Sequence, residues 1–339
     1  MSWFKKQARV GAAAEGEAGA TPPGMLAEEG QDVRAAYPAD AGCQGAAAAA
    51  REGRWEPGAE LLAEAGKDWD RRSAVVAVLG EAAAEEDDWL YAWQEARPGD
   101  PDAAVVEADG LVRLAWRMRG GKQAQHTGRE QFDAFTRVLG RARDACHRAA
   151  ELTTPTDPTP YAVELSVGLG LGYSHDDFRE LFAEVVERAP YHQSAHGSAM
   201  QFWCEKWHGS ADLAFQFAQA AAAAAPPGLL FSRFPLISWF EHHDYLVPAP
   251  DDSSPALTAL VDAALADAAA ATEDSAQLRA LRHVLAYYLY RQARYTEALD
   301  QFRAVDGHIG ALPWVYAPRP ARMYTLLRDT AYRAQGGAA

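Results

Sequence analysis

Apolar residues recur every three or four positions along most of this chain, which is the spacing of one face of an α-helix. From about residue 32 onward, segments of helical length follow one another, separated by short clusters of Gly, Pro and Asp. The alternation of apolar and polar residues that marks a half-buried strand is nearly absent. We therefore predict an all-α protein built from up-and-down helices with short connections.

The predicted helices can be placed along the chain from this spacing and from capping residues. Asp100 and Pro101 suit the cap and the first position of a helix that ends at Gly120, and Ser174 and Ser210 suit N-caps. We predict helices at 32–51, 55–66, 69–82, 84–96, 101–120, 129–151, 160–171, 175–189, 191–207, 210–225, 255–271, 274–292, 295–304 and 320–334.

The strongest interruption of the helical pattern is TTPTDPTP at residues 153–160, because its prolines cannot continue a helix. It divides the predicted fold into an N-terminal half, residues 31–152, and a C-terminal half, residues 160–335. Residues 1–30 contain few large apolar side chains and much Gly, Ala and Glu. We expect them to form a disordered N-terminal arm.

One helix pair carries a repeat signature. In HVLAYYLYRQARYTEALDQFRAV, residues 283–305, Leu285, Ala286 and Leu289 fall where a tetratricopeptide repeat has its Leu-Gly-x2-Tyr. Ala298 and Phe302 supply the Ala-x3-Phe of its second helix, where a small residue lets two helices approach and a ring fills the gap. The segment therefore resembles a tetratricopeptide repeat, and 279–305 is its clearest unit.

Two other segments match the second-helix pattern in part, GRWEPGAELLAEA around Gly58 and HGSADLAFQFAQAAAAAAPP around Ala214. The anchors Gly58, Ala214 and Ala298 are 156 and 84 residues apart. Neither interval is a multiple of the roughly 34 residues of this repeat. We therefore expect an irregular antiparallel helix-pair array, a tetratricopeptide-like α-solenoid.

A second resemblance rests on ARPGDPDAAVVEADGLVRLAWRMRG, residues 96–120, and ERAPYHQSAHGSAMQFWCEKWHGS, residues 187–210. Both are similar to an uncharacterised family of bacterial Ala-rich helical proteins. That family shows a helix ending Ala-Trp-x-x-Arg-Gly and a later Lys/Arg-Trp-Gly-Gly-Ser turn, in which His208 replaces a glycine here. The resemblance implies a helical bacterial protein and assigns no chemistry.

Charge and cysteine content narrow the class of protein. A net charge of −15 argues against a nucleic-acid partner, which would require concentrated Lys and Arg. The three cysteines, Cys43, Cys146 and Cys204, are far apart and include no CxxC, which favours a reducing compartment. Neither a secretory signal nor an apolar run long enough for a membrane span is evident. We predict a cytoplasmic protein.

The segment YHQSAHGSAMQFWCEKWHGS, residues 191–210, concentrates residues that could bind a metal. His192 and His196 lie four apart and would share a helix face. With Glu241, His242 or His243 they could hold an ion, so a metal-dependent enzyme is our alternative hypothesis. We favour an ordinary half-buried helix and expect no cofactor, because no general-base Glu lies between the two histidines.

Other catalytic signatures are missing from the sequence. VGLGLGYSHDDF places glycines before a helix, but it lacks GK[ST] and puts Asp176 and Asp177 where a phosphate would bind. Neither a G-x-S-x-G motif nor a Cys/His nucleophile pattern occurs.

The preferred function is a non-catalytic scaffold or adaptor that binds a protein or peptide in a concave groove. Tetratricopeptide proteins bind extended peptides with residues of the first helix of each pair, and aromatic residues with one or two cations suit an acidic or amphipathic peptide. A place in an ordinary packed helix is the alternative for each residue. The resemblance implies these groove residues: His283, Tyr287, Tyr290 and Arg291 in the clearest unit, and His196, Trp203, Lys206 and Trp207 in the segment 195–208.

Overall fold

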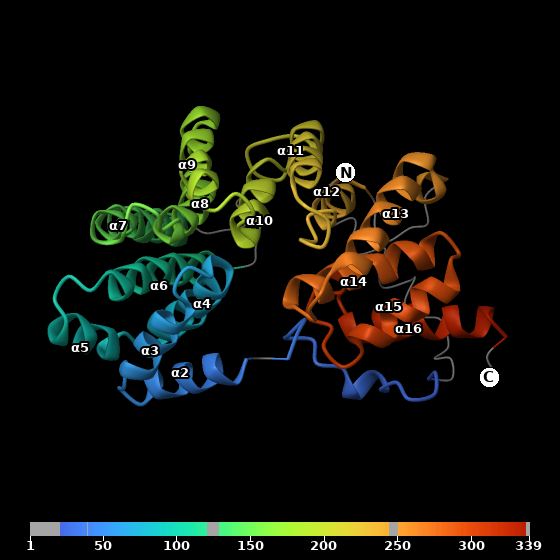
Figure 1. Cartoon of the computed structure of the whole chain (residues 1–339), viewed down its shortest axis with the longest axis horizontal. Helices are drawn as coiled ribbons and strands as arrows, with labels where there is room; N and C mark the ends of the chain where they lie inside the picture. Colours follow the sequence, from blue (N-terminus) through green and yellow to red (C-terminus); the bar gives the residue numbers. More distant parts are fainter. Residues whose placement is uncertain (1–20, 39, 121–128, 244–249, 337–339) are drawn as a thin grey trace. The chain divides into compact units, whose positions relative to one another are not determined.

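Helices account for most of the chain from residue 41 onward (Figure 1). The structure is a computed structural model, and it describes residues 21–38, 40–120, 129–243 and 250–336. Over those ranges every regular element is a helix, apart from one isolated bridge between Asp32 and His308. This confirms the all-α prediction for that part of the chain. None of its helices is long and apolar enough to traverse a lipid bilayer.

The described residues form two compact units. The middle unit lies between Pro38 and Ser210 in the sequence, and the terminal unit combines the residues up to Pro38 with those from Ser210 onward. These bounds differ from the predicted halves. TTPTDPTP lies inside the middle unit, where it connects α7 (Arg129–Leu152) to α8 (Thr159–Leu171), and these two helices pack against each other.

The middle unit contains nine of the described helices in sequence order. Besides α7 and α8 they are α2 (Ala41–Arg51), α3 (Glu56–Ala65), α4 (Trp69–Glu85), α5 (Asp88–Ala96), α6 (Pro101–Arg119), α9 (His175–Arg188) and α10 (Gln193–Phe202).

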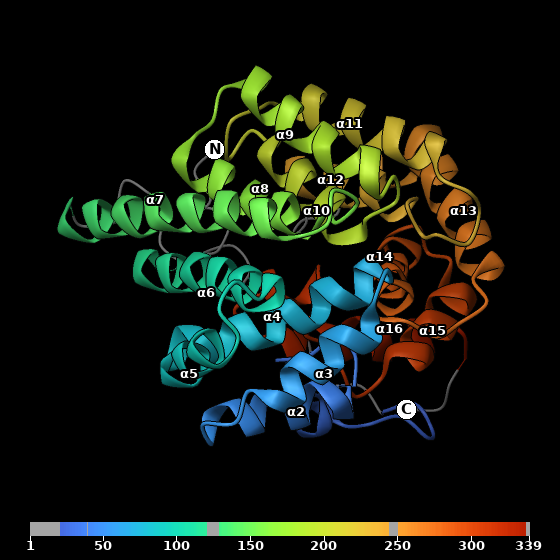
Figure 2. The ribbon, with the colours of Figure 1, turned by 60° about the vertical axis from the view of Figure 1, so that its left-hand side comes forward.

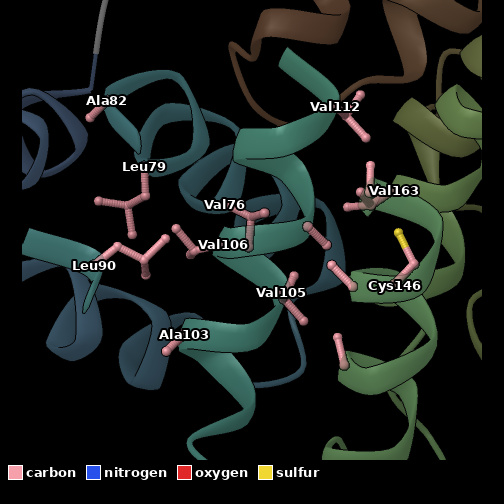
Figure 3. Close-up of a cluster of buried hydrophobic side chains, with 14 of the residues drawn as sticks. Val76, Leu79, Ala82, Leu90, Ala103, Val105, Val106, Val112, Cys146 and Val163 are labelled. Carbon is pink, nitrogen blue, oxygen red and sulfur yellow. The ribbon is translucent and has the colours of Figure 1, made fainter. Parts of the chain in front are cut away.

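Helix α6 is the centre of this unit, because α4, α7 and α8 all pack on it (Figure 2). It begins where the sequence predicts: the Asp100 carboxylate accepts from the backbone N–H of Asp102, and Pro101 takes the first position. Figure 3 shows Val105 and Val106 of α6 among the side chains of its neighbours. Both are fully buried, and burying each contributes roughly 1.5–3 kcal/mol.

The terminal unit holds the remaining described helices. They are the short helix η1 (Glu28–Gly30), α11 (Ala211–Ala224), α12 (Arg233–His242), η3 (Pro250–Ser253), α13 (Pro255–Ala270), α14 (Ala276–Arg291), α15 (Tyr295–Val305), η4 (Trp314–Tyr316) and α16 (Pro320–Ala334).

Helices α14 and α15 pack side by side and form the centre of the terminal unit. Their bounds agree closely with the predicted 274–292 and 295–304. Ala298 and Phe302 are fully buried, as the packing argument from the sequence requires, and the Phe302 ring lies 5.2 Å from that of Tyr324 on α16.

An extended segment near the N-terminus completes the terminal unit, and we call residues 25–37 the N-terminal strap. It runs beside residues 306–310, which follow α15 (Figure 1). Asp32 donates its backbone N–H to Gly307 at 2.9 Å, Ile309 donates to Asp32 at 2.8 Å, and Gly310 donates to Ala35 at 2.9 Å. The strap thus adds a short piece of backbone pairing to a helical unit.

Asp306 anchors the strap. Its carboxylate accepts from the backbone N–H of Leu26 at 2.6 Å and from Gln31 Nε2 at 2.8 Å. The fully buried Arg328 of α16 donates to Asp306 at 3.2 Å and to the carbonyl of Leu26 at 2.6 Å. The Asp306 carboxylate and the Arg328 guanidinium therefore hold the strap through the backbone of Leu26 and the side chain of Gln31.

Two predictions for this region are wrong over the described residues. Residues 21–30 are an ordered part of the terminal unit rather than a disordered arm, and the helix predicted to start at 32 starts at Ala41. The strap is held by backbone groups and by polar side chains far away in sequence, so its own apolar pattern does not report it. The rest of the predicted arm, residues 1–20, lies outside the described residues.

The helix predicted at 191–207 is shorter than expected. Helix α10 ends at Phe202, and the chain then turns through residues 203–209. Gly209 closes the turn against the backbone of Trp203, where a Cβ would lie 1.9 Å from the Trp203 carbonyl oxygen. As a result, Lys206 and Trp207 project from a turn and not from a helix face.

Candidate functional site

Aromatic side chains and one arginine gather where α6 ends, α7 begins and the turn after α10 passes by. We call Trp116, Arg119, Phe132, Phe135 and Trp207 the Trp–Arg cluster. Trp116 and Arg119 are three residues apart in the last turn of α6, which places them on the same face. Phe132 and Phe135 come from the first turns of α7, and Trp207 comes from the turn that follows α10.

Trp116 meets both Trp207 and Phe135 edge to face, which is a favourable aromatic arrangement. The centroids of Trp116 and Trp207 are 5.5 Å apart at an interplanar angle of 86°. Trp116 lies 5.1 Å from Phe135 at 68°, and Phe135 lies 6.2 Å from Phe132. These contacts connect residues from two stretches about 90 positions apart in the sequence.

Arg119 stacks on both indoles. Its Cζ lies 5.4 Å from the centroid of Trp116 and 5.2 Å from that of Trp207, within the range of a cation–π contact. Gln131 of α7 donates to the carbonyls of Met118 and Arg119 and so fixes the end of α6 that carries the cluster.

Helix α8 leaves room for the cluster because residue 170 is glycine. A Cβ at Gly170 would lie 2.4 Å from Cδ1 of Leu139 and 2.9 Å from Cζ of Phe135. Gly168 likewise leaves room for the rings of Tyr173 and Phe178, because a Cβ at residue 168 would lie 3.0 Å from the first ring and 3.2 Å from the second. The alternating glycines of VGLGLG thus permit close packing of rings against a helix.

The cluster is open to solvent at its edge. Phe132 is 44% exposed, although it is a large apolar residue. Trp116 and Trp207 are partly buried, and Lys206 beside Trp207 is exposed. A buried aromatic layer therefore reaches the surface together with positive charge.

Arg119 has no carboxylate partner among the described residues. It forms no ion pair there, and its side-chain N–H groups donate no hydrogen bond to any described protein group. Burial alone lowers the pKa of its guanidinium from the ordinary value, because no nearby carboxylate offsets the loss of hydration.

The groove residues predicted in α14 are mostly core residues, which corrects the prediction. His283 is fully buried; its Nδ1 accepts from Trp314 Nε1 at 3.0 Å and its Nε2 donates to the carbonyl of His308 at 3.1 Å. Tyr287 is 2% exposed, and its ring packs on Trp314. Neither side chain is available to a peptide.

The other two predicted residues of α14 are held within the terminal unit. Arg291 forms a buried ion pair with Asp252 and donates to the hydroxyl of Tyr287 at 3.2 Å. Tyr290 is partly buried, with its ring 5.9 Å from that of Tyr295. The alternative of an ordinary packed helix describes this segment better.

The second predicted set divides into buried and exposed members. His196 is 5% exposed and its Nδ1 donates to the carbonyl of His192 at 2.9 Å. Trp203 is 6% exposed and lies under Arg179, whose Cζ is 5.1 Å from the indole. Both are therefore poor contact residues. Lys206 and Trp207 reach the surface at the Trp–Arg cluster.

His192 has a structural role as the N-cap of α10. Its Nδ1 accepts from the backbone N–H of Ala195 at 3.3 Å, and its Nε2 donates to the Ser73 hydroxyl of α4 at 3.0 Å. Burial lowers the pKa of His192 to about 4, because a charged imidazole would lose its hydration there. The hydrogen bond from the neutral ring to Ser73 therefore connects the start of α10 to α4.

The metal alternative finds no support in the described residues, which contain no group of three or more His, Cys, Asp or Glu able to hold an ion. His242 and His243 each donate Nδ1–H to a carbonyl of their own helix end, at 2.8 Å in both cases. Glu241 accepts from the Tyr316 hydroxyl at 2.8 Å.

One polar cluster in the middle unit combines residue types that occur in catalytic sites. The buried Glu164 carboxylate accepts from His147 Nε2 at 3.1 Å and from the Tyr173 hydroxyl at 2.9 Å. Burial raises the pKa of the nearby Cys146 thiol well above its ordinary value, and so disfavours the thiolate that would act as nucleophile. The cluster connects α7, α8 and the turn after α8.

Comparison with known proteins adds no relative: no family model, no curated protein and no solved structure matches this chain.

Reasoning from the sequence missed four residues of the cluster, namely Trp116, Arg119, Phe132 and Phe135. A signal existed, because the helix end Ala115-Trp116-x-x-Arg119-Gly and the turn Lys206-Trp207 are the two motifs that carry the second resemblance. The structure brings these motifs into contact.

Proposed function

We propose that this protein is a non-catalytic scaffold or adaptor that binds a protein or peptide, and that the Trp–Arg cluster is its contact surface. The observation that carries the proposal is the meeting of Trp116, Arg119 and Trp207 in a cluster that includes the exposed Phe132. Tryptophan and arginine dominate the binding energy of protein interfaces, since they combine large contact area with directional donors.

The buried polar groups of the chain support a binding role over a catalytic one. Hydrogen bonds within the fold hold the side chains of His192, His196 and His283. The Glu164 carboxylate likewise accepts hydrogen bonds from His147 and Tyr173. Their hydrogen bonds position helices. We further propose that the helix pairs form an irregular array similar to tetratricopeptide repeats, for which the close packing of α14 on α15 is the support.

Affinity capture with matched variants tests the proposed function. The full chain is immobilised and exposed to a lysate of its source organism, beside the variants Trp207→Ala and Tyr91→Ala. Tyr91 of α5 is 52% exposed and belongs to the same unit, so it controls for loss of any exposed ring. We expect a protein that the wild type and Tyr91→Ala retain and that Trp207→Ala loses, with equal helicity by circular dichroism.

Two results would contradict this proposal. Equal capture by Trp207→Ala would show that the cluster is not the contact surface. Failure of the wild type to retain any protein in stoichiometric amount would remove the scaffold function.

A further inference from the structure

We infer that the Trp–Arg cluster recognises an Asp or Glu side chain that lies next to an apolar residue in a peptide segment of the partner, with Arg119 as the group that binds the carboxylate. This inference rests on the proposed binding function and specifies the chemistry of the ligand.

The first argument comes from the other stacked arginines. Six other arginines that lie over an aromatic ring also pair with a carboxylate. Arg97 over Trp55 is an example, with Asp100 Oδ2 at 3.7 Å. The further examples are Arg179 with Asp176, Arg188 with Glu184, Arg279 with Asp274, Arg291 with Asp252 and Arg328 with Asp306.

Arg119 departs from this arrangement, since it contacts two indoles and pairs with no described carboxylate. Its neighbour Arg117 is already paired with Glu81 and Glu85. A partly desolvated guanidinium with unused N–H donors gains more from a carboxylate than a fully hydrated one does. The partner that Arg119 lacks among the described residues is thus a monoanion that a ligand can supply.

The surroundings of Arg119 define the rest of the ligand. Phe132 provides exposed apolar surface, and Trp116 and Trp207 provide partly buried rings. These side chains suit an apolar residue adjacent to the acid. The net charge of −15 opposes association with a strongly acidic tract, so one acid within an apolar segment fits better than a run of acids.

Selection from a random peptide library displayed on phage, with the full chain as bait, tests the inference. Enriched sequences are synthesised with a fluorescent label and an amidated C-terminus, and each acid is replaced by its amide in a matched peptide. Fluorescence anisotropy then gives the affinity of each peptide for the wild type, Arg119→Gln and Arg97→Gln. Circular dichroism verifies that all three proteins are folded.

We expect enriched peptides with Asp or Glu beside an apolar residue. Replacing that acid by its amide, or Arg119 by Gln, should weaken binding by about tenfold or more, and the two changes together should cost little beyond either one. Arg97→Gln should bind as the wild type does, because its guanidinium is occupied by Asp100.

The outcomes separate the two proposals. If peptides are enriched but bind Arg119→Gln as tightly as the wild type, the carboxylate inference fails and the scaffold function stands. Binding that requires a free C-terminal carboxylate would also overturn the inference, since the anion would then come from the chain end. If no peptide is enriched and no protein is captured from lysate, the proposed function fails as well.

Discussion

The buried imidazole of His283 should make the terminal unit sensitive to acid. Burial lowers the pKa of His283 from 6.5 to about 4, against the smaller raising effect of its hydrogen bond to the His308 carbonyl. At about 1.4 kcal/mol per pH unit, this lowering corresponds to about 3 kcal/mol of unfolding free energy. That is a large part of the stability of an ordinary domain.

The sign follows from proton binding. Below pH 6.5 the unfolded chain binds a proton at this histidine, whereas the folded chain remains neutral there until the pH approaches 4. The stabilisation is therefore complete above about pH 6.5 and is lost as the pH falls towards 4. Protonation would also break the hydrogen bond that Nδ1 accepts from Trp314.

The assay compares the wild type with His283→Gln and with His243→Gln, an exposed histidine of the same unit. Hydrogen exchange of the α14 amides in urea, measured between about pH 7 and pH 4, reports the stability of the terminal unit. Wild type and His243→Gln should lose about 3 kcal/mol more than His283→Gln across this range. Parallel pH profiles for all three proteins would refute the reasoning.

Two further substitutions test packing and the strap. Gly170→Ala should destabilise the middle unit by roughly 1–2 kcal/mol, because the new Cβ would clash with Leu139. Gly140→Ala on α7 is the control: its Cβ would meet open space, so it should stabilise the unit by up to about 1 kcal/mol. Urea unfolding measures both changes. Asp306→Ala should lower the unfolding free energy of the terminal unit by about 3 kcal/mol, because the buried Arg328 then loses one of its two carboxylate partners. Faster hydrogen exchange confined to the strap and α16 would support that role, and unchanged exchange there would contradict it.

Local rules predicted most helices well. Where a cap residue and a helical apolar pattern coincide, as at Asp100, Ser174 and Ser210, the start of the helix agrees with the structure to within a residue. Burial of Ala298 and Phe302 also agrees with what the Ala-x3-Phe resemblance implies. These features depend on residues close together in the chain.

The misses involve groups that are distant in sequence. The strap is held by Asp306 and Arg328, about 280–300 residues away from Leu26, so no local pattern reveals it. The prediction of a binding face on α14 was wrong for a related reason. Packing from α16, η4 and the segment around Asp252 covers Tyr287 and Arg291, and a repeat signature does not specify what covers a helix.

The candidate surface overlaps the groove residues predicted from the sequence only around Lys206 and Trp207. Lys206 is exposed and Trp207 is partly buried, and both lie on a turn and not on the predicted helix face. Arg119 was not expected, because a lone arginine at a helix end is usually a favourable partner of the helix dipole. Its significance depends on which carboxylates are near it, and only the folded arrangement shows that.

The order of assembly during synthesis follows from the strap. The middle unit is inserted between two parts of the terminal unit, and Leu26 finds its partner Asp306 only 280 residues later. During synthesis on the ribosome the middle unit can therefore fold before the N-terminal strap has a partner to bind. The terminal unit closes last, so an internal deletion in residues 25–37 and one in α16 should damage the same late step.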